Sequence, residues 1–360
     1  MKILIDGIAY SLKKTGGVRR YFDGLLPNLK KLDKNLEIEL FLPKKIPTPP
    51  PKTIFEPLLG PINEIILRRQ WESIKGDIFH TTYYTRHPDK KIPQVVTVYD
   101  MIYEKFPQYF SSKKNQFFKK QKKKAVESAD ALICISKNTK KDILKFFQVD
   151  ENKISVIYPG VNLNFKKISD KFKKNKFLQK YKIKKPYLLF VGPRGRYKNF
   201  LFFVKAYASW EKNLNFDLIV VGGTKFSNEE GQYLNKLGVK NKAFNFRYVT
   251  DKDLSLFYNC AYAFIFPSLY EGFGLPLLEA MACGTLCLAS NKSSFPEIGR
   301  NSILYFDPEK PHDILKNLNQ SLHKDKRLKL IEKSLKRAKD FSFKKTAKQT
   351  LEVYKRLHHS

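Results

Sequence analysis

The chain has 360 residues, of which 42% are hydrophobic, and its formal net charge is +34. This length suits two α/β domains that each bury their own core. The longest apolar runs, such as 187–191 and 261–266, are far too short to cross a bilayer, so no transmembrane helix is expected. The first residues run from Lys2 through a short apolar stretch to Asp6, which is typical of a strand and not of a signal peptide. We therefore expect a cytoplasmic protein.

The positive charge has two explanations. Either the surface attracts polyanions, such as nucleic acid, acidic lipid headgroups or anionic substrates, or a lysine-rich composition spreads charge over solvated faces. The cysteines are scattered, which favours buried free thiols over a disulfide framework or a four-ligand zinc site; they are Cys134, Cys260, Cys283 and Cys287.

The first half of the chain alternates predicted strands and helices. Residues 2–6 predict a strand, a loop with Gly16 and Gly17 follows, and apolar residues at helical spacing over 18–32 predict a helix. The proline-rich stretch 43–61 predicts a mobile surface loop. Further strands are predicted at 77–80, 95–99 and 131–135. This alternation indicates a mostly parallel sheet that is covered on both faces.

The second half repeats the pattern. The lysine-rich stretch 166–185 lacks strand character and is predicted to link an N-terminal domain, 1–165, to a C-terminal domain, 186–340. Residues 341–360 are expected to form a C-terminal helix, a candidate for packing back on the N-terminal domain. Strands are predicted at 187–191, 216–221, 244–249, 261–266 and 285–289. The fold class is therefore expected to be α/β, with two doubly wound, Rossmann-like domains whose ligands lie beyond the carboxyl ends of the strands.

The segment 266–279 has the features of a ligand site. An apolar strand ends there, a glycine-containing turn follows, and Pro276 is predicted to be the first residue of a helix. Gly274 allows close approach of the backbone, and the amides of a helix N-terminus favour a phosphate or a charged sugar oxygen. Glu271 and Glu279 either bind sugar hydroxyls from one cleft or favourably place negative charge at the helix start.

A second basic turn follows the first strand of the C-terminal domain, at 192–199. In a doubly wound sheet this turn lies on the same edge as the acidic one. Arg194 and Lys198 can neutralise a diphosphate leaving group in place of a metal ion, although an isolated basic turn is more often surface charge.

The Glu-x7-Glu pair, within Pro-Ser-Leu-Tyr-Glu-Gly-Phe-Gly-Leu-Pro-Leu-Leu-Glu, resembles the donor-site signature of glycosyltransferase family 4, whose members are retaining GT-B enzymes. The resemblance covers nearly the whole chain and includes the segments 77–80, 96–104, 156–161, 191–200 and 294–297. It implies a GT-B fold, in which two doubly wound domains face each other across a cleft.

The resemblance also implies how the donor sugar is held. Glu271 is expected to contact the transferred sugar and to act as a catalytic residue. The amides of Phe273, Gly274 and Leu275 are expected to hold the sugar and phosphate, and Glu279 the ribose hydroxyls.

The nucleoside diphosphate is expected to contact other positions that match the family. The resemblance places the diphosphate against Arg194 and Lys198, with Arg196 competing for the first role. The Gly16-Gly17 loop is expected to close on the phosphates, and Val249 lies in the neighbourhood expected to touch the base.

The acceptor side departs from the family pattern. Relatives commonly have histidine where this chain has Tyr99 and Tyr103, which puts a histidine-based acceptor role at Tyr99 in doubt. His80 and Asp100 lie at the ends of predicted strands, so they are expected to face the cleft, and they are the remaining catalytic candidates. His80 is equally well interpreted as a packed, hydrogen-bonded histidine, and Asp100 as a helix cap; Asp100 is preferred for acceptor positioning or general-base help.

The function predicted from the resemblance is retaining transfer of a hexose from GDP-mannose or a UDP-hexose to a glycan or lipid-linked glycan in surface polysaccharide synthesis. No metal and no cofactor besides the donor are expected. Lys113 to Lys124, with Phe117 and Phe118, predict a basic helix that either contacts an anionic membrane peripherally or is a solvated face.

Three alternatives stay open from the sequence. Two share the architecture with different chemistry, namely a sugar-nucleotide epimerase and a glycosyltransferase that modifies DNA bases. The third is a nucleic-acid-binding protein, but the aromatic residues are not interleaved with basic ones in a binding motif, so specific nucleic-acid binding is not expected.

Overall fold

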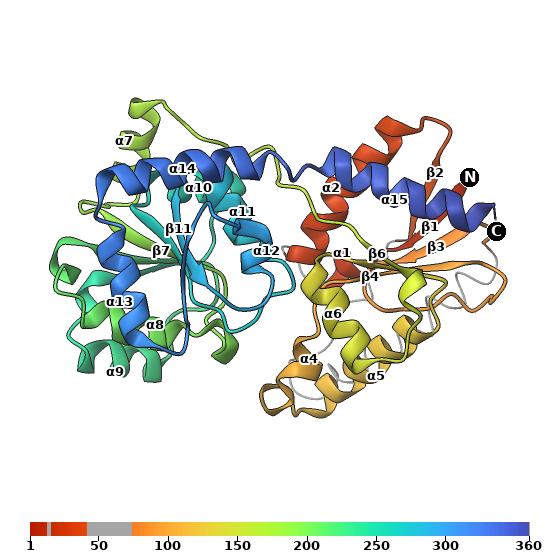
Figure 1. Ribbon diagram of the computed structural model, residues 1–360, viewed down its shortest axis with the longest axis horizontal. Helices are drawn as coiled ribbons and strands as arrows, with labels where there is room; N and C mark the ends of the chain where they lie inside the picture. Colours follow the sequence, from red (N-terminus) through yellow and green to blue (C-terminus); the bar gives the residue numbers. More distant parts are fainter. Residues whose placement is uncertain (13–15, 42–73, 360) are drawn as a thin grey trace, which may run out of the picture. The chain divides into compact units, whose positions relative to one another are not determined.

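The computed structural model describes residues 1–12, 16–41 and 74–359. These residues form two compact units, of which the first comprises Met1–Gly160 with Ser342–Ser360 and the second Val161–Phe341 (Figure 1). The proline-rich stretch predicted to be a surface loop lies outside the described residues.

The first unit contains a parallel sheet of six strands in the order β2-β1-β3-β4-β5-β6. The strands are β1 (Lys2–Asp6), β2 (Glu37–Phe41), β3 (Ile78–Thr81), β4 (Gln94–Val98), β5 (Ala131–Cys134) and β6 (Ile154–Val156). The parallel sheet and its four predicted strands are confirmed. The chain order departs from the spatial order at β1, which is the doubly wound arrangement.

The helices among the described residues of the first unit are α1 (Ile8–Leu12), α2 (Gly17–Leu32), α4 (Ile102–Lys105), α5 (Lys113–Glu127), α6 (Lys137–Phe146) and α15 (Phe343–His358), with short 3-10 turns at Pro107–Tyr109 and Glu151–Lys153. Serine side chains cap α5, α6 and α15 by accepting a hydrogen bond from the third helical amide. The predicted helix over 18–32 is confirmed as α2.

Helix α15 contacts α2 and the strands β3 and β5 (Figure 1). The packing is so close that a Cβ atom on Gly160 would lie 2.1 Å from the backbone nitrogen of Phe343. A Cβ atom on Gly24 would similarly lie 2.4 Å from the ring of Phe343. The last helix of the chain is therefore a part of the first unit.

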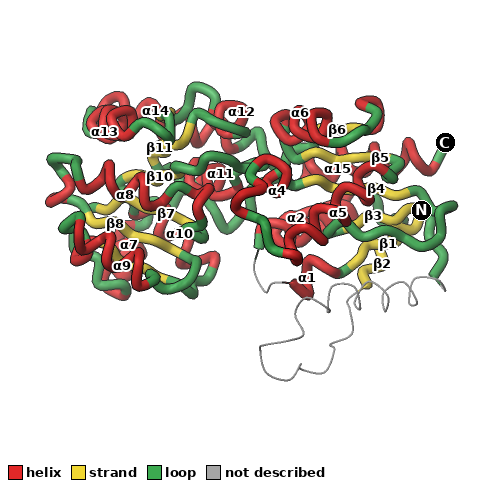
Figure 2. Tube along the Cα trace, turned by 90° about the horizontal axis from the view of Figure 1, so that it is seen from below, coloured by secondary structure: helices red, strands yellow, loops and turns green. Residues whose placement is uncertain are grey.

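The second unit also contains a parallel six-stranded sheet, in the order β12-β11-β10-β7-β8-β9. The strands are β7 (Tyr187–Val191), β8 (Asp217–Val221), β9 (Ala243–Phe246), β10 (Ala263–Phe266), β11 (Leu286–Ser290) and β12 (Leu304–Phe306). All five strands predicted for this half are present. Strands run through the middle of each unit with helices on both sides (Figure 2).

The helices of the second unit are α7 (Lys171–Lys180), α8 (Phe200–Ala208), α9 (Asn228–Lys236), α10 (Asp251–Cys260), α11 (Leu275–Ala282), α12 (Phe295–Gly299), α13 (Pro311–Gln320) and α14 (Lys324–Ala338), with 3-10 turns at Arg196–Lys198, Asn213–Asn215 and Lys240–Lys242. Helix α7 lies within the stretch predicted to be a linker. Phe177 of α7 packs edge-to-face against Phe257 of α10, with ring centroids 4.8 Å apart. The stretch 166–185 thus belongs to the second unit.

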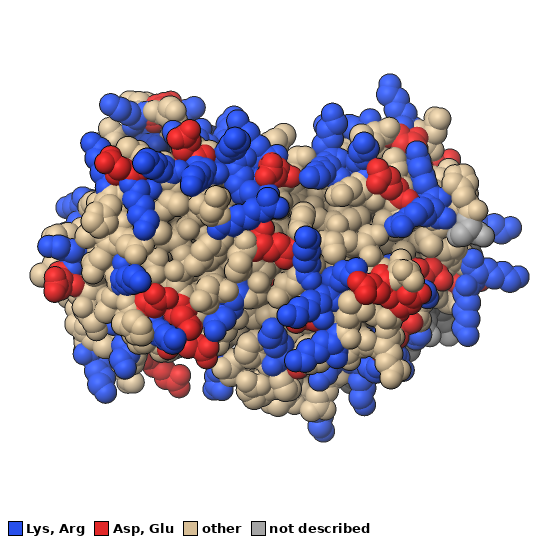
Figure 3. Space-filling model, in the orientation of Figure 1, with Lys and Arg blue, Asp and Glu red and all other residues tan. Residues whose placement is uncertain are grey.

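The structure also shows where the cysteines and the charged side chains lie. Three of the four free cysteines are buried, and Cys260 is partly exposed, so the prediction of buried thiols holds for all but one. No helix among the described residues is long and apolar enough to span a bilayer. Lys and Arg side chains are scattered over the visible face of both units, with acidic side chains among them (Figure 3), which agrees with the compositional explanation of the charge.

Candidate donor site and acceptor-side residues

Three loops of the second unit meet at the carboxyl ends of adjacent strands. They follow β10, β7 and β8, which are neighbours in the sheet. The loops comprise residues 267–274, 192–199 and 222–227. Parallel strands place all three at one edge of the sheet, where doubly wound domains bind their ligands.

The structure brings Lys198 and Glu271 together. The ammonium nitrogen of Lys198 lies 2.5 Å from a carboxylate oxygen of Glu271, and their side chains are 13% and 15% exposed. The backbone amide of Leu269 donates to the carbonyl of Tyr197 at 2.8 Å and ties the same two loops. A cation and a carboxylate therefore lie side by side at this edge, within reach of a ligand.

The turn before α11 is held in a shape that only glycine adopts readily. Gly274 has φ +101°, and a Cβ atom there would lie 3.1 Å from the ring of Phe295. The hydroxyl of Ser294 donates to the carbonyls of Glu271, at 3.0 Å, and Phe273, at 2.8 Å. Helix α11 begins at Leu275, so Pro276 is its second residue and not its first. The amides of Phe273, Gly274 and Leu275 thus belong to a braced turn at a helix start.

The two glutamates of the motif have different surroundings. Glu279, in α11, is only 4% exposed and accepts a hydrogen bond from the hydroxyl of Tyr258 at 3.1 Å. Glu271 precedes the helix and is partly exposed. The structure thus leaves Glu271 partly open and covers Glu279, and the expectation that both point into one cleft stays a prediction. Val249 is half-buried in the loop between β9 and α10.

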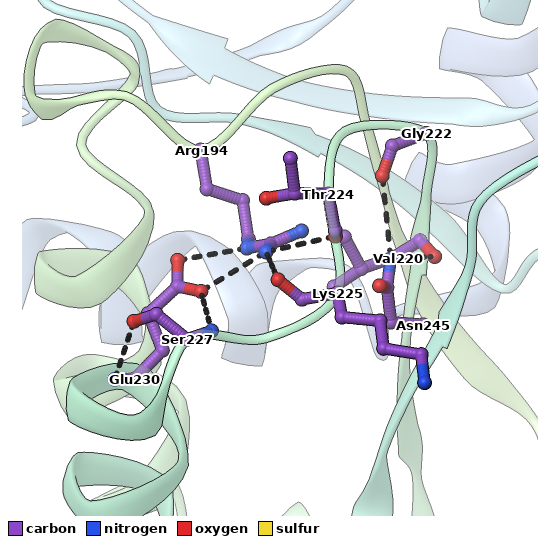
Figure 4. Close-up of polar contacts among 8 residues, drawn as sticks. All are labelled: Arg194, Val220, Gly222, Thr224, Lys225, Ser227, Glu230 and Asn245. Carbon is purple, nitrogen blue, oxygen red and sulfur yellow. Dashed lines mark hydrogen bonds and ion pairs between the residues drawn. The ribbon is translucent and has the colours of Figure 1, made fainter. Parts of the chain in front are cut away.

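Arg194 is covered, although the sequence predicts it as a diphosphate ligand. Its guanidinium makes a two-pronged contact with Glu230, at 2.8 and 3.0 Å, and also donates to the carbonyls of Thr224 and Lys225 (Figure 4). The side chain is 3% exposed. Arg196, the competing residue, is exposed. Arg196 is therefore the exposed cation of the turn, and Lys198 is the one that pairs with Glu271.

Sequence reasoning missed Glu230. Its carboxylate accepts from the amide of Ser227, and the hydroxyl of Ser227 accepts from the amide of Glu230, which forms a capping box at the start of α9. The spacing Ser-Asn-Glu-Glu was a signal for the cap but not for the partner, because Arg194 is distant in the sequence.

Gly16 and Gly17 lie at the start of α2 in the first unit. Gly16 is the N-cap residue, and a Cβ atom there would have no neighbour within 4 Å. Gly17 is exposed. The structure thus gives these glycines open surroundings, and the proposed contact with donor phosphates stays a prediction.

His80 is fully buried inside the first unit, so the prediction that it faces a cleft is wrong. Its Nδ1 lies 2.5 Å from the hydroxyl of Tyr354 in α15, and its Nε2 lies 2.7 Å from the hydroxyl of Thr97 in β4. Burial lowers the pKa of His80 to about 3, which keeps the ring neutral. The alternative interpretation, a packed and hydrogen-bonded histidine, fits this environment.

Asp100 is partly exposed at the start of α4. One carboxylate oxygen accepts a hydrogen bond from the amide of Ile102, the first residue of α4, at 3.1 Å, but the N-cap residue of this helix is Met101 and not Asp100. Burial and then the negative charge of Asp100 raise the pKa values of Tyr84 and Tyr103. Tyr99 is buried and donates to the carbonyl of Thr82 at 3.2 Å. Tyr84 and Tyr103 therefore lie near enough to the Asp100 carboxylate to be affected by its charge.

Helix α5 has a buried side as well as a basic face. Lys122 is 2% exposed and pairs with Glu104 at 2.5 Å, and its ammonium also donates to the carbonyl of Asp100. Phe118 packs edge-to-face against Tyr83. The predicted basic helix is present, but part of its charge and of its aromatic surface stabilises the first unit.

The fold defines a class, because two doubly wound parallel sheets in one chain are the GT-B architecture. A sucrose-phosphate synthase from Thermosynechococcus elongatus is similar over 99% of both chains, with a TM-score of 0.79 and 18% identity. Anabaena Alr3699/HepE, solved with UDP and glucose, is similar over 99% of both chains, with a TM-score of 0.75 and 16% identity.

The sequence then identifies the family. Residues 15–165 match Glycosyltransferase Family 4 and residues 171–337 match Glycosyl transferases group 1. The chain therefore carries the two domains of family 4, group 1 glycosyltransferases. This confirms the resemblance inferred from the donor-site motif.

Two relatives are O-antigen enzymes. The O-antigen chain mannosyltransferase RfbU of Salmonella typhimurium is 33% identical over 63% of this chain, and the match spans 61% of the relative. The O-antigen chain mannosyltransferase B of Escherichia coli is 28% identical over 81% of this chain and 77% of its own length.

Proposed function

We propose that the chain is a retaining hexosyltransferase that moves mannose from a nucleoside diphosphate sugar to a glycan or lipid-linked glycan acceptor of a surface polysaccharide. The observation that carries this proposal is the Lys198–Glu271 pair beside the start of α11. The names of the O-antigen relatives support mannose and this class of acceptor. The UDP bound to Anabaena Alr3699/HepE supports a UDP-hexose as the alternative donor.

The donor displaces Lys198 from Glu271. The lysine then binds a phosphate oxygen with Arg196, while Glu271 accepts hydrogen bonds from sugar hydroxyls. Positive charge held where the leaving diphosphate develops negative charge lowers the barrier to its departure. The protein's cations fill the role that a metal ion fills elsewhere, so transfer is expected to continue in EDTA.

Retention follows from attack on the face that the diphosphate leaves. The bond between the anomeric carbon and the phosphate oxygen breaks, and the acceptor oxygen forms its bond to the same face of that carbon. The acceptor proton passes to the departing phosphate oxygen, so no enzyme nucleophile is needed. Asp100, partly exposed and close to Tyr103, is proposed to orient the acceptor hydroxyl.

The test is turnover of a panel of nucleotide sugars with a mannose-terminated lipid-linked oligosaccharide acceptor. GDP-mannose, or a UDP-hexose, is expected to release nucleoside diphosphate with formation of a product of unchanged anomeric configuration, read by NMR. Conversion of the sugar to another sugar that stays attached to the nucleotide would instead indicate an epimerase. Absence of turnover and of binding with every donor would contradict the proposal.

We also propose that α5 guides the enzyme to an anionic membrane, because Lys113, Lys120 and Lys124 are exposed on it. Each lysine near such a surface contributes about 1 kcal/mol. Sedimentation with phosphatidylglycerol vesicles is expected to fall when the three are changed to glutamine, whereas three exposed lysines of α14 changed alike serve as control. Equal losses in both sets would refute a specific role for α5.

A further inference from the structure

The guanidinium of Arg194 donates hydrogen bonds to other residues of the second unit. Nε and Nη2 contact the two carboxylate oxygens of Glu230, and Nη2 also reaches the carbonyls of Thr224, at 3.1 Å, and Lys225, at 2.9 Å (Figure 4). The guanidinium carbon lies 4.7 Å from the centre of the Phe226 ring. A two-pronged arginine–carboxylate contact fixes orientation as well as distance. This arrangement holds the side chain in one conformation.

The third nitrogen, Nη1, is buried and has no hydrogen-bond partner among the described residues. It lies under the loop that follows β8, since a Cβ atom on Gly223 would be 3.3 Å from it. Gly223 has φ +71°. Nη1 therefore lies against the glycine backbone of the loop after β8.

The basic turn 192–199 is therefore fixed at both ends. At its start Arg194 joins it to the loop after β8 through Glu230. At its end the carbonyl of Tyr197 joins it to the loop after β10, and the side chain of Asn199 donates to the carbonyl of Pro308 at 2.6 Å. Arg196, which is exposed, and Lys198, which pairs with Glu271, lie between these attachments.

Glu230 is suited to this task because it stays charged. Burial acts to raise its pKa, but the hydrogen bonds from Arg194 and from the amide of Ser227 outweigh burial, and the pKa of Glu230 is lowered. The capping box fixes the same carboxylate to the start of α9. Helix α9 thus anchors the guanidinium.

We propose that Arg194 and Glu230 are positioning residues, which set the turn so that Arg196 and Lys198 bind the donor diphosphate, while Arg194 itself does not contact it. This inference rests on the proposed function, since it assumes a diphosphate donor. It differs from the expectation for the family motif, which assigns the diphosphate to Arg194.

The test is a double-mutant cycle on nucleoside diphosphate affinity, measured by calorimetry with UDP and GDP and, for comparison, UMP and GMP. Glu230→Gln keeps an oxygen for the cap but removes the charge that holds Arg194. Arg194→Gln removes the other partner. Glu229→Gln is the matched control, because Glu229 is exposed on the same turn of α9. If Glu230→Gln does not fold, Glu230→Asp replaces it, because aspartate keeps the charge but shortens the reach to Arg194.

Each single variant is expected to weaken binding of the diphosphate about tenfold, and the double variant no more than either single one. Binding of the monophosphate is expected to change little, and Glu229→Gln to bind like the wild type. A much larger loss in Arg194→Gln than in Glu230→Gln, with additive effects, would show direct contact of Arg194 with the donor and overturn the inference. So would wild-type binding by Glu230→Gln. Failure of the wild-type protein to bind either diphosphate would instead remove the proposed function, and this inference with it.

Discussion

A buried histidine that cannot accept a proton makes the stability of the first unit depend on pH. His80 has a folded-state pKa of about 3, against an ordinary value of 6.5. Below about pH 6.5 the unfolded chain binds a proton that the folded chain does not, so the free energy of unfolding falls as pH falls. This loss continues until the pH passes the folded-state value.

The expected loss from pH 7 to pH 5 is about 2 kcal/mol, since each unit of pKa difference corresponds to about 1.4 kcal/mol. His80→Gln removes the titrating group but keeps a donor and an acceptor for Tyr354 and Thr97. Wild type and variant are compared by urea denaturation at both pH values, followed by circular dichroism. Between pH 7 and pH 5 the wild type is expected to lose about 2 kcal/mol more unfolding free energy than the variant, because only the wild type carries the titrating group.

The same variant separates structure from catalysis. Because both ring nitrogens face buried hydroxyls, His80→Gln is expected to keep transfer at pH 7 within a few-fold of the wild type. Parallel stability curves for the two proteins would refute the assignment of a neutral, buried His80. A loss of transfer of 100-fold or more with an intact fold would refute its structural role.

Two further predictions concern glycines. Gly274→Ala places a side chain at φ +101° and against Phe295, so we expect a loss of about 1–2 kcal/mol in unfolding free energy and weaker nucleotide binding. Both effects are measured by thermal shift with and without UDP or GDP. Unchanged nucleotide binding would contradict the braced turn. Gly160→Ala collides with the backbone of Phe343 and is expected to destabilise by about 3 kcal/mol in urea denaturation, whereas Gly231→Ala, in the helix interior with open space, is expected to stabilise by about 0.5–1 kcal/mol. Equal stability of these two alanine variants would contradict the close seating of α15.

The sequence predicts nine of the twelve strands that the structure describes, because these are short apolar runs of the kind that parallel sheets bury on both faces. It does not predict α7, because this helix is rich in lysine and lacks an apolar face, with Phe177 as its one buried side chain. The strand β2 is missed for a related reason, since acidic residues alternate with apolar ones and no residue of it is fully buried. The prediction is weakest where few side chains enter the core.

The donor site shows a similar division. Glu271 and Lys198 are predicted together because parallel strands bring their loops to one edge, which topology alone determines. The coverings of Arg194 and His80 depend on Glu230 and on Tyr354, which are distant in the sequence and supplied by other elements. Motif position reveals where a strand ends but not which side chain reaches back over it.

The measurement that tests the account most directly is calorimetric binding of UDP and GDP to the wild type, Lys198→Ala and Lys205→Ala. Lys205 is exposed on α8 and controls for loss of one positive charge. We expect the nucleotide that the wild type binds to bind Lys205→Ala equally and Lys198→Ala at least tenfold more weakly, with the melting temperatures preserved. Equal affinity of the wild type and Lys198→Ala would contradict a diphosphate site at the Lys198–Glu271 pair.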